Sequence, residues 1–188
     1  MQIQAFTTSI SFQKKFMSNA TVIENGKKSE CKIFEVNYKE DKDYFEKVQN
    51  DKNWKKAVYL DEIIEDFPYD FPYEKIYTIE NIKEECLGYL SIDVFDKHKL
   101  EVNLIETCPE YSIRNKKRGI QNIGKELMNF LVGMAKDRNV DAITVPIVAD
   151  SAFPFYEKYG FKTFNHKEAD DEARLDSADF DNVLAKNK

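Results

Sequence analysis

Hydrophobic and polar residues alternate along parts of the chain and follow helical spacing in others. Alternation over residues 30–38 predicts a first half-buried strand, and apolar positions over residues 41–58 predict one or two short helices. Three more strands, the last two joined by a hairpin, are predicted at residues 75–80, 86–95 and 99–107. These three strands would form an antiparallel meander.

The second half of the chain has the most regular pattern. Apolar residues over positions 120–138 keep helical spacing, and Asn139 suits a left-handed residue at the helix end. The apolar run at residues 142–148 predicts a buried strand, in which Pro146 indicates a place where neighbouring strands separate. Strand, helix and strand in this order predict a parallel crossover, so we expect a mixed α/β fold. A last edge strand is expected near residues 173–180.

Composition favours one globular domain spanning residues 1–188. Hydrophobic residues make up 42% and aromatic residues 13% of the chain, enough for a packed core. The formal net charge of -6 disfavours nucleic acid as a partner, because phosphate binding needs a basic face. No long apolar run or signal peptide is evident, so we expect a cytoplasmic protein that does not enter the membrane.

Cysteine and histidine are too sparse to indicate a metal site or a disulfide framework. Cys31, Cys86 and Cys108 are widely spaced and include no Cys-x-x-Cys pair. His98 and His166 are the only histidines. We therefore expect no metal cofactor.

Two segments carry candidate chemistry. Residues 118–127 combine basic side chains and glycines with a helix start, whose amide groups attract phosphate. Residues 151–161 place a tyrosine within a short aromatic helix that stops at a glycine. In this order the segments resemble the GNAT superfamily of acyl-coenzyme A-dependent N-acyltransferases, with a resemblance extending over about residues 87–161. It implies a mostly antiparallel central sheet with a parallel β-α-β crossover and splayed strands.

The resemblance implies that acetyl-CoA (coenzyme A) binds at the start of the long helix. There, Gly119 would permit unusual backbone angles and Gly124 would allow close approach. Asn122 stands where the family commonly has a glycine, and Ala149 where it often has Asn. Asn tolerates left-handed angles, so the loop can still close. The expected cofactor contacts are Thr107, Cys108, Arg118, Gly119, Gln121, Asn122, Ile123, Gly124, Lys125, Ser151 and Phe155.

The same resemblance implies two catalytic side chains. Tyr156 aligns with the family tyrosine near the cofactor sulfur and would protonate the leaving thiolate. Glu106 would accept the proton of the amine, although the side of the sheet that it faces depends on whether a bulge is present. A backbone amide near Glu106 or Thr107 would stabilise the oxyanion. A nucleophilic role for Cys108 is disfavoured because no histidine or basic partner is evident.

The amine acceptor is expected to bind near residues 40–74, and the cofactor near residues 100–161. Residues 59–73 are rich in carboxylates and aromatic rings, which could hold a cationic small molecule or a lysine or peptide amine; alternatively, they form a solvated loop that covers the core.

Two functions of the protein stay open. One is an N-acetyltransferase; the other is an acyl-CoA-binding or protein-interaction module with a degenerate active site, which the departures at Asn122 and Ala149 would suit. A homodimer is also left open.

Overall fold

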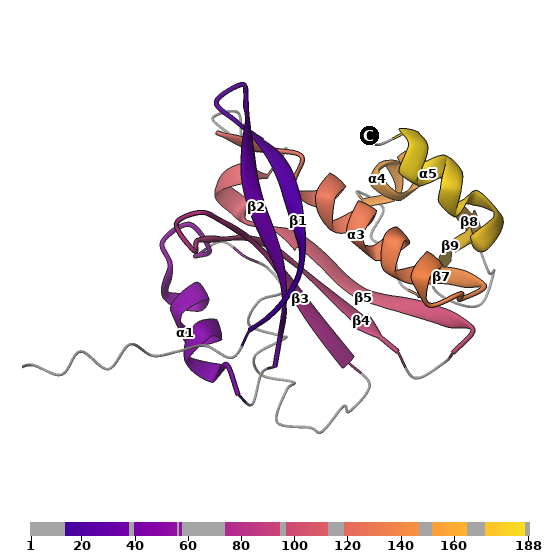
Figure 1. Cartoon of the computed structure of the whole chain (residues 1–188), viewed down its shortest axis with the longest axis horizontal. Coiled ribbons are helices and arrows are strands. Elements are labelled where there is room, and N and C mark those ends of the chain that lie inside the picture. Colours follow the sequence, from indigo (N-terminus) through magenta and orange to yellow (C-terminus); the bar gives the residue numbers. More distant parts are fainter. Residues whose placement is uncertain are drawn as a thin grey trace, which may run out of the picture.

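A twisted sheet with helices on both faces organises the protein (Figure 1). The structure is a computed structural model and describes residues 14–37, 40–55, 57, 74–94, 97–112, 119–146, 152–164 and 172–186. Within these residues the sheet has nine strands in the order β6-β1-β2-β3-β4-β5-β7-β9-β8. The strands are β1 (Lys15–Glu24), β2 (Lys27–Val36), β3 (Glu74–Asn81), β4 (Cys86–Asp93), β5 (Lys99–Thr107), β6 (Ile120–Gln121), β7 (Ala142–Val145), β8 (Lys162–Phe164) and β9 (Glu172–Asp176).

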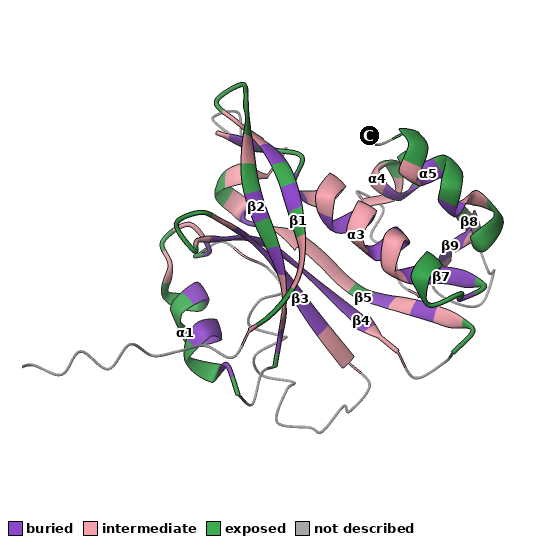
Figure 2. Ribbon diagram, viewed as in Figure 1, coloured by how far each residue is buried: buried purple, intermediate pink, exposed green. Residues whose placement is uncertain are grey.

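The helices pack on opposite faces of this sheet. In the described part of the chain they are α1 (Lys42–Asn50), α3 (Ile123–Asp137), α4 (Phe153–Lys158) and α5 (Phe180–Lys186), with 3-10 turns at Pro109–Tyr111 and Ser177–Asp179. Figure 2 shows purple buried positions on the helix sides that face the sheet. One buried cluster joins α3, α4 and α5 to the sheet, and a second joins α1 and Trp54 to the other face. The expected mixed α/β fold, with a mostly antiparallel sheet, is confirmed.

The first described residues form a hairpin that the hydrophobic pattern alone did not predict. β1 and β2 pair antiparallel through a turn at Asn25 and Gly26, whose φ angles are 50° and 78°. Two positive φ angles are what a two-residue hairpin turn requires, and Asn-Gly is its preferred sequence. The predicted first strand at residues 30–38 is therefore the second strand, β2, and starts earlier.

The meander and the crossover agree with expectation. β3, β4 and β5 pair antiparallel in chain order, and β5 pairs parallel with β7 after the chain has passed through α3. That parallel pairing covers only residues 99–101 and 142–144, whereas β5 continues to Thr107. The two strands therefore stop pairing along the second half of β5. We call this place the β5–β7 fork.

Three boundaries differ from expectation. α3 starts at Ile123 rather than at residue 120, because Ile120 and Gln121 pair with β1 instead. Among the described residues of the predicted helical segment 41–58, residues 42–50 form a helix and residues 51–55 form a bend and turns. β9, expected as an edge strand, lies between β7 and β8 and is followed by helix rather than by more strand.

Candidate active site

The start of α3 is shaped as an open group of amides. Asn122, the residue before the helix, is left-handed with φ 72°, and its own side chain makes no cap hydrogen bond. The first intrahelical bond runs from the Glu126 N–H to the Asn122 carbonyl, at 3.0 Å. The amides of Ile123, Gly124 and Lys125 precede this bond and carry the positive end of the helix dipole.

The residues just before α3 are tied to the β1–β2 hairpin. Gly119 does not have a positive φ, so the unusual backbone angle expected there belongs to Asn122 instead. The Gly119 carbonyl accepts a hydrogen bond of 2.9 Å from the Asn25 N–H. Gln121 pairs with Ile23 on β1 and lies outside the helix. The loop is therefore anchored to the tip of the β1–β2 hairpin.

Gly124 brings three chain segments together at the β5–β7 fork. A Cβ atom at this position would lie 3.3 Å from the Phe155 ring and 3.7 Å from the Thr107 methyl group. Phe155 belongs to α4, and Thr107 is the last residue of β5. Three residues predicted as cofactor contacts thus adjoin one another, and a side chain at position 124 would occupy the space between them.

Glu106 faces the side of the sheet that α1 covers. Its carboxylate accepts a hydrogen bond of 2.5 Å from the Tyr89 hydroxyl on the neighbouring strand, with which it is in register. Tyr89 is buried, and its ring lies 5.6 Å from that of Trp54. The Trp54 indole N–H in turn donates to the Cys86 carbonyl at 3.1 Å. A rigid aromatic pair therefore holds the Glu106 carboxylate in place.

The backbone of β5 also has a defined orientation at the fork. The Cys108 N–H donates to the Leu87 carbonyl of β4 at 2.8 Å. Because successive residues of a strand point their N–H groups to opposite sides, the Thr107 N–H points away from β4. It therefore points to the side where the pairing with β7 has already ended.

Tyr156 lies on α4 within the core cluster of the α3 face. Its ring makes edge contacts with those of Phe155 and Phe161, each with centroids 5.3 Å apart. Burial raises the pKa of the Tyr156 phenol well above its ordinary value. The phenol is therefore fully protonated at neutral pH, which is the state that a proton donor needs.

Cys108 has the surroundings of a structural residue. Its side chain is fully buried on the α1 face, and its thiol donates to the Asn53 carbonyl at 3.4 Å. Burial raises the pKa of this thiol to about 11, so it is not a thiolate at neutral pH. The Cys108 carbonyl accepts a bond from the Tyr111 N–H. Both its backbone polar groups are thus engaged within the protein.

Part of the predicted site lies outside the described residues: Arg118, Ser151, Ala149 and the acidic aromatic segment at residues 59–73. Sequence reasoning missed Tyr89 and Trp54, because their relation to Glu106 depends on strand register. It also missed the role of Asn25, although Asn25-Gly26 is a strong hairpin signal.

Two pockets lie away from the β5–β7 fork. One, of about 590 Å³, is lined by residues of β1, β2 and the end of β3. The other, of about 500 Å³, lies between β1 and α3. In the described part of the chain, no three His, Cys, Asp or Glu side chains gather so that they could hold a metal ion. No helix in that part combines the length and apolarity needed to span a bilayer.

Comparisons with known proteins agree with this architecture. Residues 32–169 match a family model described as an acetyltransferase (GNAT) domain. No curated protein matches the sequence significantly. The fold is similar to that of PaiA N-acetyltransferase from Thermoplasma acidophilum in complex with coenzyme A (14% identity, TM-score 0.54, covering 78% of this chain and 98% of that chain).

Two other solved structures are similar at the same level. One is a spermidine N-acetyltransferase SpeG chimera from Vibrio cholerae and hSSAT (16% identity, TM-score 0.53, covering 81% of this chain and 98% of that chain). The other is the N-acetyltransferase PseH from Campylobacter jejuni (18% identity, TM-score 0.52, covering 77% and 97%). These likenesses concern the fold, whereas the family model covers most of this sequence. The resemblance inferred from the two motif segments is confirmed, and the chain belongs to the GNAT acetyltransferase family.

Proposed function

We propose that this protein is an N-acetyltransferase that moves an acetyl group from acetyl-CoA to a primary amine of a cationic small molecule or of a lysine or peptide. The observation that carries the proposal is the meeting of the uncapped α3 start with Thr107 and Phe155 at the β5–β7 fork. The printed names of similar structures supply further support, since one contains coenzyme A and another is a spermidine N-acetyltransferase.

The residues at the fork fit the demands of coenzyme A. The amides of Ile123, Gly124 and Lys125 would hold its diphosphate, because a helix start favours negative charge. The missing side chain at Gly124 leaves room beside Phe155. The contacts proposed from the sequence also include Arg118, Ser151 and Gln121. We do not include Cys108 among the proposed cofactor contacts, because its thiol and backbone polar groups bond within the protein.

Where strands part, a slot can reach both faces of the sheet, and the proposed chemistry uses both. When bound, acetyl-CoA supplies the acyl group as a thioester. Glu106, on the α1 face, would accept the proton of the amine, and Tyr156, on the α3 side, would protonate the departing sulfur. The Thr107 N–H, which points toward the fork, would donate to the oxyanion. Tyr89 would keep the Glu106 carboxylate oriented.

Replacement of Tyr156 by Phe tests this proposal. General acid catalysis contributes about 10²–10⁴-fold to a rate, so kcat should fall by about 10²-fold or more while the affinity for coenzyme A stays unchanged. Tyr159→Phe is the matched control, because Tyr159 is equally buried at the end of α4 and also packs on Phe155. Rates are measured as thiol release with a panel of amines, and affinity by calorimetry.

The outcomes separate the two functions left open by the sequence. Equal rates in wild type and Tyr156→Phe, or an equal loss in Tyr159→Phe, would refute the role of Tyr156. Binding of coenzyme A without turnover across the amine panel would instead favour a coenzyme-binding module.

A further inference from the structure

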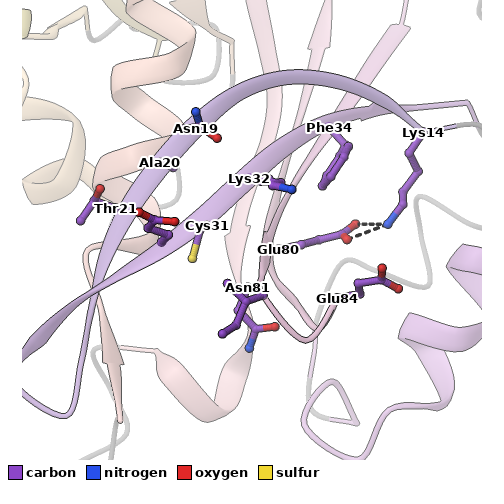
Figure 3. Close-up of a pocket in the computed structure, with 12 residues that line it drawn as sticks. Lys14, Asn19, Ala20, Thr21, Cys31, Lys32, Phe34, Glu80, Asn81 and Glu84 are labelled. Carbon is purple, nitrogen blue, oxygen red and sulfur yellow. Dashed lines mark hydrogen bonds and ion pairs between the residues drawn. The ribbon is translucent and has the colours of Figure 1, made fainter.

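The ammonium group of Lys14 lies in a pocket made of a carboxylate and aromatic rings. Its Nζ atom is 2.6 and 2.8 Å from the two oxygens of Glu80 (Figure 3). The same atom lies 4.8 Å from the ring centroid of Phe34 and 4.6 Å from that of Tyr44. A carboxylate with two aromatic faces is an arrangement that recognises an organic cation. We call Glu80, Phe34 and Tyr44 the ammonium box.

The ammonium box is built into the sheet. The Glu80 side chain is only 2% exposed, and the Thr78 hydroxyl donates to it at 3.3 Å. Thr78 and Glu80 lie on β3, Phe34 lies on β2 and Tyr44 on α1, so three elements fix the geometry. A buried carboxylate needs a cationic partner, because charge without a partner is unfavourable in the interior. A cation next to the Glu80 carboxylate is therefore energetically favourable.

The pocket around the ammonium box has room for more than the Lys14 side chain. It has a volume of about 590 Å³ and is lined by three carboxylates, Glu30, Glu80 and Glu84, against two lysines, Lys14 and Lys32. Without Lys14 the lining would carry an excess of two negative charges. The field in the pocket therefore favours a cationic guest.

Lys14 can leave the ammonium box without breaking the sheet. The strand ladder begins one residue later, where Lys15 pairs with Glu35. The Lys14 side chain is 11% exposed and reaches the box from outside this ladder. Its removal would therefore open the pocket while leaving the β1–β2 pairing in place.

The ammonium box and Glu106 lie on the same face of the sheet. Tyr44 and Tyr89 belong to one buried cluster on the α1 side. Glu80 pairs with Cys86, and Glu106 pairs with Tyr89, three residues further along β4. Two strand spacings across and three residues along put the Glu80 and Glu106 Cα atoms about 14 Å apart. A linear acceptor with amines at both ends could reach both carboxylates.

We propose that the ammonium box is a binding site for a primary alkylammonium group. The Lys14 side chain of the same chain occupies the box when no acceptor is bound, and the unreacted ammonium of a polycationic acceptor displaces it. The site would thus select acceptors that carry two separated amines, and the Lys14 side chain would compete with them. The link to the acceptor rests on the proposed acetyltransferase function, whereas binding of an ammonium group does not.

The first experiment measures binding without acetyl-CoA. Lys14→Ala empties the ammonium box, and n-butylammonium, which has the four carbons and the ammonium of the lost side chain, should bind to this variant by calorimetry and raise its melting temperature. The neutral analogue n-butanol should do neither. Wild type should bind butylammonium at least tenfold more weakly than the variant. If Lys14→Ala does not fold, Lys14→Gln serves, since it removes the charge and keeps hydrogen-bond donors.

Two further variants control this experiment. Lys15→Ala removes a neighbouring lysine whose side chain is 72% exposed, and it should respond to butylammonium as wild type does. Lys14→Ala with Glu80→Gln should lose the response. The proposal is overturned if butylammonium fails to bind Lys14→Ala, or if it binds wild type or the double variant as tightly as it binds Lys14→Ala.

Acceptor assays distinguish the source of the ammonium. Spermidine and a peptide with one lysine and a free N-terminus are compared with butylamine in wild type and Lys14→Ala. At least a tenfold gain in kcat/KM for spermidine alone assigns the box to a small polyamine, and a gain for the peptide alone assigns it to a peptide. Gains that include butylamine, or no gain at all, refute selection by the box. If no amine is acetylated, the proposed function fails while the binding result still decides the ammonium site.

Discussion

Gly88 lies on β4 beneath the first turns of α3, where the strand and the helix come closest. A Cβ atom at this position would be 2.8 Å from the Glu106 carbonyl oxygen, 2.9 Å from the Ile123 Cγ2 atom and 3.3 Å from the Leu127 Cδ1 atom. The nearest of these atoms is backbone, so no flexible side chain can simply turn away. Gly88→Ala must therefore displace either β5 or the start of α3.

The size of this effect follows from the contact distances. Carbon and carbonyl oxygen normally approach to about 3.3 Å, so the elements must separate by about 0.5 Å. Overpacking of this kind costs about 1–3 kcal/mol, and the lower entropy of unfolded Ala offsets about 0.4–1 kcal/mol. We expect the free energy of unfolding to fall by about 1–2 kcal/mol. For a chain of this size, that lowers Tm by about 2–8 °C.

Gly133 provides the matched control for this prediction. It lies within α3, and a Cβ atom there would meet nothing within 4 Å. Gly133→Ala should raise stability by about 0.5–1 kcal/mol, because Ala favours helix. Thermal and urea unfolding of both variants give the comparison. A Gly88→Ala protein as stable as wild type, or an equal loss in Gly133→Ala, would show that the contact at Gly88 does not limit packing.

Three other substitutions test separate parts of the structure. Gly124→Ala should weaken coenzyme A binding about tenfold or more in calorimetry, because the new methyl group fills the space beside Phe155. Its Tm should stay unchanged or rise, because Ala favours helix more than Gly does. An unchanged affinity for coenzyme A would show that Gly124 does not belong to the cofactor site. Tyr89→Phe should lower the free energy of urea unfolding by about 1–2 kcal/mol through loss of the bond to Glu106, and no change would contradict that bond. Burial raises the pKa of the Cys86 thiol from 9.0 to about 12, so the unfolded chain loses this proton first and stability should fall by about 1.4 kcal/mol per pH unit above pH 9. Cys86→Ala should show a shallower decline by that amount, and parallel curves would argue against the shift.

The predicted elements that proved right are those whose signal is local. Helical spacing predicted α3, and alternation predicted the β3–β4–β5 meander. Asn139 is left-handed, with φ 55°, at the expected end of α3. The strand-helix-strand order also predicted the parallel pairing of β5 and β7. Each of these follows from the period of the pattern or from the order of elements along the chain.

The β1–β2 hairpin differs from the prediction even though the sequence carries a local signal for it. The pattern of hydrophobic residues did not predict β1, although Asn25-Gly26 marks its hairpin turn with β2. Ile120 pairs with the end of β1, and a prediction without β1 therefore assigned Ile120 to the helix and started α3 three residues too early. The missing β1 strand thus led to a wrong start for α3, about a hundred residues further along the chain.

The sequence alone determined the family and supplied the candidate site residues, because motif spacing, helix period and residue type are properties of short segments. Only the tertiary structure decided that Glu106 faces Tyr89, that Gly124 meets Phe155 and Thr107, and that Lys14 fills the ammonium box. Those relations join residues that are far apart in the chain. They depend on strand register and helix packing, which are set by the burial of the whole core and cannot be obtained from any one segment.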